Sequence, residues 1–200
     1  MKPSSLNPLA MLAAVVAFVS ISAPAFSQQT IIVINEDRIL RESAVGQHIA
    51  SRLQAISSEM EGELLALRAP IDAEAERLNA ETEPLTQEAV QQRPDLMQRI
   101  QTVSQQAQQF EATRQRYANE LTATERGAMR PVLEALQAVL QEVVAARSAD
   151  IVIDRGALVY SGPSVDASDD VITRLNGRLP TVPVNRVRLP QGDAQQPRQQ

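Results

Sequence analysis

Two long apolar stripes with helical spacing run through the middle of the chain and limit what it can fold into. Within each stripe the apolar side chains recur mostly every three or four residues, and the surface between them is charged or rich in glutamine. This pattern indicates the narrow seam of a coiled coil. The first seam consists of Leu53, Ile56, Met60, Leu64, Leu67, Ile71 and Leu78. The second consists of Leu96, Ile100, Val103, Ala107, Phe110, Tyr117, Leu121, Ala128, Val132, Leu136, Val139 and Val143.

A polar segment with two prolines separates the seams. Pro94 suits the first turn of a new helix, because that position needs no backbone N–H donor. Two helices of about 50 residues would each extend about 75 Å, and such a helix needs a partner along its length. An antiparallel hairpin supplies the partner. We therefore predict a helical arm over residues 36–147 with its tip near residues 84–95.

Pro70 and Pro131 fall inside the predicted helices. Each removes one backbone hydrogen bond, so we predict a kink at each position.

Short β-branched runs flank the arm and predict three strands. A tight turn at Arg155-Gly156 would join the second and third strands as a hairpin. The strands are Ile31, Ile32, Val33 and Ile34; then Ile151, Val152 and Ile153; then Leu158, Val159 and Tyr160. They are too few and too apolar to be buried within one chain, and pooling them between protomers would remove their exposed edges.

The predicted fold is therefore α+β, with a long antiparallel helical hairpin projecting from a small β body. Residues 28–35 and 148–177 would form the body, including a short closing helix that Ser168 begins and Asn176-Gly177 ends. Residues 178–200 are rich in proline and glutamine with few apolar side chains, and we predict that they are disordered.

The N-terminus resembles an export signal. Lys2 precedes an apolar stretch, Leu9–Ile21, and small residues follow it. We predict a signal peptide over residues 1–27, cleaved after Ser27 or Ala25, and a periplasmic mature protein without stable membrane insertion. An uncleaved membrane anchor is the alternative, although the apolar run is shorter than the roughly 20 residues that span a bilayer.

Composition excludes several kinds of chemistry. The chain has no cysteine and a net charge of −5, which argues against disulfides, zinc–thiolate sites and nucleic-acid binding. His48 is the one histidine, and a solvated helix residue explains it better than a metal ligand. An acidic group near the C-terminal strands is explained by strand ends and a helix N-terminus: Asp150, Asp154, Asp166, Asp169 and Asp170. We expect no catalytic residues, cofactor or metal, and no enzymatic activity.

The segment IVIDRGALVYSGPSVDASDDVITRLN, residues 151–176, resembles the C-terminal signature of the Skp/OmpH family of periplasmic outer-membrane-protein chaperones. The opening strand TIIVIN and the long hairpin agree with it, so the resemblance covers residues 30–176. It implies a homotrimer whose strands build a shared β body and whose three arms enclose unfolded outer-membrane proteins without ATP. The best-known members have basic arms, whereas residues 36–147 here hold 12 Arg against 18 Asp and Glu.

Two functional hypotheses follow. The first is a periplasmic holdase chaperone that binds unfolded outer-membrane proteins between coiled-coil arms and prevents their aggregation. The second is an envelope scaffold or adaptor that binds one folded partner through its acidic arm or its tail. The acidic stretch Glu59–Glu88 is better explained as a solvated helix face, which needs no partner.

Overall fold

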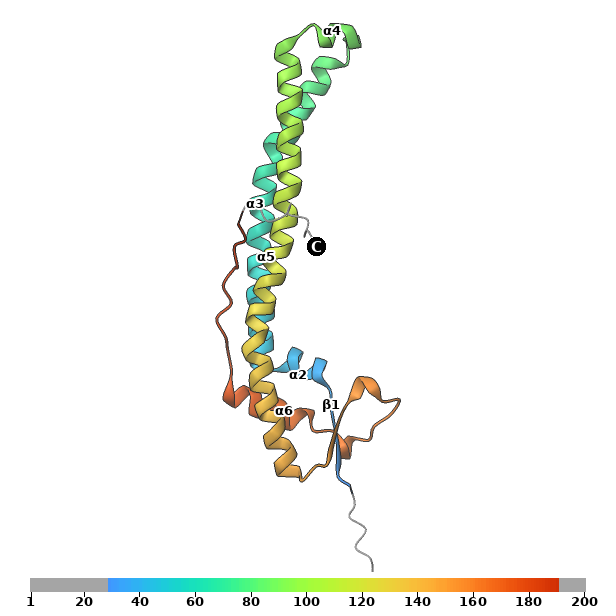
Figure 1. The fold of residues 1–200 in the computed structure, drawn as a ribbon, viewed down its shortest axis with the longest axis vertical. Helices are drawn as coiled ribbons and strands as arrows, with labels where there is room; N and C mark the ends of the chain where they lie inside the picture. Colours follow the sequence, from blue (N-terminus) through green and yellow to red (C-terminus); the bar gives the residue numbers. More distant parts are fainter. Residues whose placement is uncertain (1–28, 191–200) are drawn as a thin grey trace, which may run out of the picture.

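The computed structural model describes residues 29–190 and shows an elongated molecule (Figure 1). Helices α3 and α5 form a long arm, and a small body lies at one end of it. This confirms the predicted α+β fold with a helical hairpin and a small β part. The predicted signal peptide and its cleavage site lie outside the described residues. The elements are β1 (Ile31–Ile34), α2 (Glu36–Glu42), α3 (Ala44–Thr82), α4 (Gln87–Gln91), α5 (Pro94–Arg147), β2 (Ile151–Asp154), the 3-10 turns η2 (Arg155–Ala157) and η3 (Pro163–Val165), and α6 (Ser168–Arg178).

The arm consists of 39 residues in α3 and 54 in α5, which pack against each other in opposite directions. We call residues 44–63 and 117–147 its basal half and residues 64–116 its distal half. Pro70 and Pro131 lie within these continuous helices, and the kinks there stay a prediction.

The chain reverses at α4, between the ends of the two long helices (Figure 1). Thr86 begins α4, with its side-chain oxygen accepting a hydrogen bond from a backbone N–H. Ion pairs then tie the end of α3 to the start of α5: Arg93 to Glu81 at 2.6 Å, and Arg99 to both Glu81 and Glu74 at 2.7 Å. These polar contacts hold the tip together beside the buried side chains of Leu78 and Leu96.

A sharp break separates α2 from α3 at Ser43, whose backbone is extended and whose side chain caps α3 by accepting the Gly46 N–H at 3.2 Å. The break brings the two helices so close that a Cβ on Gly46 would lie 1.6 Å from the Leu40 carbonyl oxygen. Only glycine fits there. The break allows α2 to fold back onto the body, where Ile39 is fully buried.

The body contains a two-stranded parallel sheet in which β1 pairs with β2, Ile31 opposite Ile151 and Ile34 opposite Asp154. The long helical hairpin serves as the crossover that two parallel strands require. On the other side of β1, Val33 makes a single bridge to Asp166. Segments at both ends of the sequence therefore meet at the base of the arm.

Helix α6 locks the body to the base of the arm. Val171 and Leu175 are fully buried. Two polar side chains of α6 satisfy backbone donors at the helix breaks: Ser168 Oγ accepts from the Asn35 N–H at 2.9 Å, and Asn176 Oδ1 accepts from the Ala44 N–H at 2.7 Å. The predicted closing helix therefore holds the starts of α2 and α3 in place.

The structure corrects the predicted third strand. Within residues 29–190 the sheet has two strands, and Leu158, Val159 and Tyr160 follow the η2 turn in an irregular loop. Asp154 Oδ1 accepts the Gly156 N–H at 2.7 Å, which favours a tight 3-10 turn over a β-hairpin turn. The loop therefore turns away from the edge of β2.

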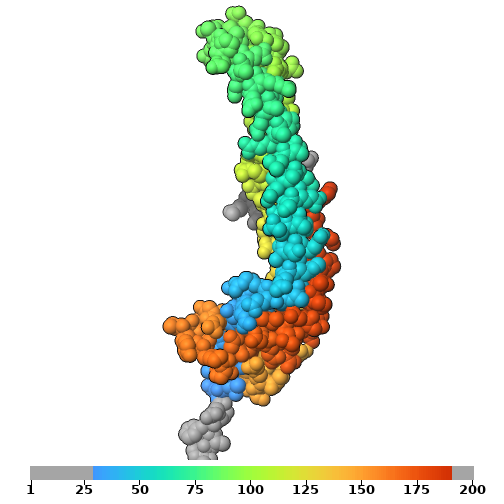
Figure 2. Space-filling view, turned by 180° about the vertical axis from the view of Figure 1, so that it is seen from behind, coloured from blue at the N-terminus to red at the C-terminus, as the bar shows by residue number. Residues whose placement is uncertain are grey.

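The structure also corrects the predicted disorder from residue 178, at least as far as residue 190. Residues 179–190, which we call the strap, are extended and lie along the basal half of the arm (Figures 1 and 2). Val182 and Val184 are each 5% exposed and belong to the main core. Burial of these valines against the helices supplies the apolar contacts that composition alone did not reveal.

Candidate interaction surfaces

The outer edge of β2 is an open apolar surface. Ile151 and Val152 are 40% and 39% exposed. In β1, by contrast, Ile32 and Val33 are only 2% exposed. In the described part of the chain, β2 pairs only with β1, so its other row of backbone N–H and C=O groups has no strand partner. An unpaired, apolar strand edge is a template for pairing with another chain.

The loop after β2 extends this apolar character. Val159 is fully exposed and Tyr160 is 83% exposed. Side chains of this kind rarely face water on a monomer without a reason. Of the ten residues predicted to form the oligomerisation strands, the structure therefore places seven in β1 and β2, and it places Leu158, Val159 and Tyr160 in this loop.

The predicted seam residues do lie on α3 and α5, but their burial varies widely. Nine are buried: Ile56, Met60, Leu78, Leu96, Ala128, Val132, Leu136, Val139 and Val143. Leu67, at 47%, and Ala107 are exposed. The others are partly buried: Leu53, Leu64, Ile71, Ile100, Val103, Phe110, Tyr117 and Leu121. Five of these eight lie in the distal half, which other elements cover less than the basal half.

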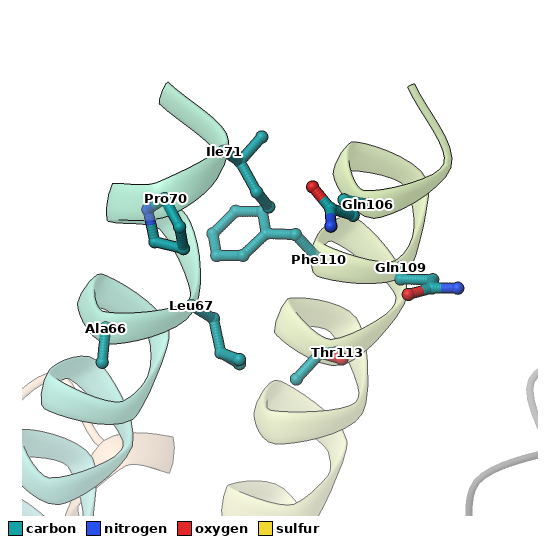
Figure 3. A pocket seen from close by; sticks show the side chains of 8 residues that line it. All are labelled: Ala66, Leu67, Pro70, Ile71, Gln106, Gln109, Phe110 and Thr113. Carbon is teal, nitrogen blue, oxygen red and sulfur yellow. The ribbon is translucent and has the colours of Figure 1, made fainter. Parts of the chain in front are cut away.

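Two hollows flank Phe110 in the distal half. One, of about 290 Å³, lies between α3 and α5 and is lined by Leu67, Pro70, Ile71 and polar residues of α5 (Figure 3). The other, of about 310 Å³, is lined by Leu64, Leu65 and the stems of Glu61 and Arg68. Figure 3 shows the Phe110 ring pointing from α5 toward α3 between these helices. Both hollows are mainly apolar with charged or amide groups at the rim, a lining that suits apolar peptide side chains.

Some charges at the tip of the arm are paired. The hydrogen bond from Arg99 lowers the pKa of Glu81, with Arg93 contributing further, so this carboxylate stays charged in more acid than an ordinary glutamate. Residues 74–99 hold six Asp and Glu against three Arg, so the tip still carries part of the net negative charge of the arm.

The acidic residues near the C-terminal strands are all occupied by structural contacts. Asp150 accepts the Thr30 N–H at 2.8 Å, Asp166 caps α6 by accepting the Ser168 N–H at 2.9 Å, and Asp170 pairs with Arg174 at 2.9 Å. Hydrogen bonding of Asp166 by Ser168 lowers the pKa of its carboxyl against the opposing effect of burial. Among residues 29–190 no cluster of three potential metal ligands occurs. Structural contacts therefore explain why these carboxylates are present.

His48 differs from its predicted role as a solvated helix residue. It is partly buried, and its Nε2 lies 3.1 Å from the Val182 carbonyl oxygen of the strap. Sequence reasoning offered the tail as a binding segment for a folded partner, but it did not predict that residues 179–190 pack on the arm, and it did not single out Arg186. The alternation of Val182 and Val184 with polar or proline residues is the period-two pattern of a half-buried extended segment and was the available signal.

The part of the chain that the structure describes has no helix long and apolar enough to cross a membrane.

Comparison with known proteins agrees with this architecture. The model of the family described as outer membrane protein (OmpH-like) matches residues 30–175. A crystal structure of a candidate outer membrane chaperone (OmpH-like) from Caulobacter crescentus CB15 is 28% identical, covers 80% of this chain and 92% of that chain, and superposes with a TM-score of 0.67. No curated protein matches. The family match spans the whole body and arm and stops before the strap, and on it the chain belongs to the OmpH-like (Skp/OmpH) family.

Proposed function

We propose that this protein is an ATP-independent periplasmic holdase, a homotrimer that binds unfolded outer-membrane proteins between its arms. Family membership supports a chaperone role, and the apolar hollows around Phe110 on an otherwise charged arm are the observation that carries the finer proposal. The predicted export signal at residues 1–27 and the absence of cysteine suit a periplasmic location.

The open edge of β2 supports oligomerisation through the body. Pairing the edges of several protomers would satisfy the free backbone groups of β2 and bury Ile151 and Val152. A Val152→Lys substitution places a charge on that edge. It should shift the protein from trimer to monomer in light scattering, and an unchanged trimer would show that the edge is not the interface.

The distal hollows support cargo binding by many weak contacts. Leu65 is 69% exposed and Leu67 is 47% exposed, and both lie beside Phe110. Three arms would present three copies of this surface to one cargo chain, so that individually weak apolar contacts add up through effective concentration. Charged side chains around the hollows keep the exposed apolar surface soluble.

The acidic arm argues against capture of cargo by positive charge. With 12 Arg against 18 Asp and Glu over residues 36–147, attraction of acidic cargo contributes little, and apolar contacts must supply most of the affinity. Binding should therefore depend weakly on salt, in contrast to association steered by net charge.

The direct experiment uses the mature chain, residues 28–200, and a urea-unfolded outer-membrane barrel protein diluted into buffer. Light scattering should show a trimer that gains the mass of one cargo chain, and aggregation should be suppressed at stoichiometric ratios. Aggregation that proceeds as in the absence of the protein would contradict the holdase proposal.

A pair of matched variants locates the binding surface. Leu65→Ser combined with Leu67→Ser removes exposed apolar surface next to Phe110 and should weaken cargo binding roughly tenfold, as expected for losing about 50 Å² of apolar contact. Leu133→Ser is the control, because Leu133 is 48% exposed and lines a separate hollow of about 660 Å³ in the basal half. Equal effects of both variants would argue against the distal site.

A folded-partner adaptor is the competing function, and the acidic sides of the arm are what favour it. In a competition experiment, a folded partner whose binding is unaffected by excess unfolded barrel protein would support the adaptor and contradict the holdase.

A further inference from the structure

Backbone groups of the strap bond to side chains of the basal half of the arm. The Val187 N–H donates to Thr124 Oγ1 at 2.9 Å, and the Leu189 N–H donates to Glu120 Oε1 at 3.1 Å. With the His48 contact to Val182, these bonds attach an extended segment to both α3 and α5. Figure 2 shows the strap lying against the lower part of the arm and ending well before the tip.

Arg186 is the centre of this attachment. Its Nη1 donates to both carboxylate oxygens of Glu63 on α3 at 2.9 and 3.1 Å, and its Nε donates to Glu120 Oε2 on α5 at 3.1 Å. The guanidinium carbon lies 4.4 Å from the centre of the Tyr117 ring. One side chain of the strap thus joins both helices of the hairpin, and Tyr117 completes the group by donating its hydroxyl proton to Glu63.

The two carboxylates make this group a potential source of repulsion. Glu63 and Glu120 bind the same guanidinium from opposite helices, and Glu120 is only 2% exposed. Without Arg186 the cation that remains beside Glu120 is Arg116, whose Nε is 3.6 Å from it and makes no hydrogen bond. Two carboxylates that share one guanidinium lie close to each other, and without that cation they repel each other in a partly desolvated site.

We propose that the strap is a detachable clasp for the arm. When it is docked, Arg186 joins Glu63 to Glu120 and holds α3 and α5 together at mid-arm. When it is released, the two carboxylates repel across the hairpin and this part of the arm loosens. The clasp lies directly below the hollows around Phe110, so it sets the point above which the arm can flex.

A strap that only covers apolar surface is the simpler alternative, and the two differ in one measurable way. If charge coupling matters, neutralising one carboxylate should compensate for the loss of Arg186. If only apolar coverage by Val182 and Val184 matters, that neutralisation should have no effect.

Hydrogen–deuterium exchange of the full mature chain tests the clasp. Arg186→Ala should speed amide exchange in residues 55–66 and 115–126 roughly tenfold or more, as expected for losing charge-assisted hydrogen bonds. Adding Glu63→Gln to Arg186→Ala should return exchange toward the wild-type rate, because the glutamine amide no longer repels Glu120.

Asn185→Ala is the matched control, because Asn185 is an exposed residue of the same strap, whereas Arg188 is close enough to Glu63 to help lower the pKa of its carboxyl. Asn185→Ala should leave exchange in both segments nearly unchanged. Unchanged exchange in Arg186→Ala would overturn the proposal, and so would faster exchange that Glu63→Gln fails to reverse. Circular dichroism of each variant would establish that the helices are intact.

Discussion

The basal and distal halves of the arm are built from the same two helices but are packed differently. In the basal half, Val132, Val139 and Val143 are fully buried beneath α2, α6 and the strap. In the distal half, Leu67 is 47% exposed and Phe110 lies between two hollows. Apart from Leu78 and Leu96 near the tip, the seam residues of the distal half are not fully buried, because α2, α6 and the strap cover only the basal half.

This contrast in packing predicts a contrast in local stability along the arm. Local stability follows the density of buried apolar contacts, so the basal half should open rarely and the distal half more often. Under the proposed function, a firm base would fix where each arm points, and a loosely packed distal half would adapt its surface to cargo of varied shape.

The largest effect is expected from a cavity in the basal core. Leu136 is 4% exposed, and Leu136→Ala should lower the free energy of unfolding by about 3 kcal/mol, because the rigid surroundings cannot fill the void. Leu133→Ala is the control on the same helix, and at 48% exposure it should change stability by no more than about 0.5 kcal/mol. Urea denaturation at one fixed protein concentration measures both, and similar losses would mean that the basal half is not the rigid part.

A smaller effect is expected where the arm leaves the body. Gly46→Ala forces a methyl group against the Leu40 carbonyl and should cost about 2 kcal/mol while displacing α2. Gly62→Ala is the matched control: it lies in α3 with nothing within 4 Å of the added Cβ, and it should stabilise by about 0.5 to 1 kcal/mol through helix propensity. Thermal unfolding of both variants checks the opposite signs. If both variants were less stable than the wild type, the space around Gly62 would not be open.

The smallest effect is expected from the ion pairs at the tip of the arm. Since the pKa of Glu81 is lowered in the folded state, its ion pairs contribute above the ordinary value of 4.5 and are lost as pH falls below it through the folded pKa. NMR titration of the Glu81 carboxyl should show this lowered pKa. In Arg99→Gln the pKa should return toward 4.5, and a titration that Arg99→Gln leaves unchanged would rule out Arg99 as the cause.

The helical hairpin could be predicted because its signals are local. Spacing of Ile56, Met60 and their counterparts on the second seam indicates helices, and Pro94 with Asp95 suits the first turn of α5, where the structure begins that helix. Strands β1 and β2 were also recognisable as short β-branched runs. The segment at residues 151–176 identified the family, which the family model confirms over residues 30–175.

Features that depend on distant partners could not be predicted in the same way. The η2 turn forms because Asp154 captures the Gly156 N–H, and this competes with the β-hairpin that the composition favours. The strap has no regular secondary structure. Its order depends on the two helices that receive Val182, Val184 and Arg186.

The sequence by itself determined the periodic elements, the turn between them and the family, because each depends on residues close together in the chain. Tertiary structure alone decided which seam residues are buried and that β1 and β2 run parallel, and it brought Arg186 between Glu63 and Glu120. These outcomes depend on contacts across more than 60 residues of sequence. Burial and charge pairing are properties of such contacts, and no local pattern encodes them.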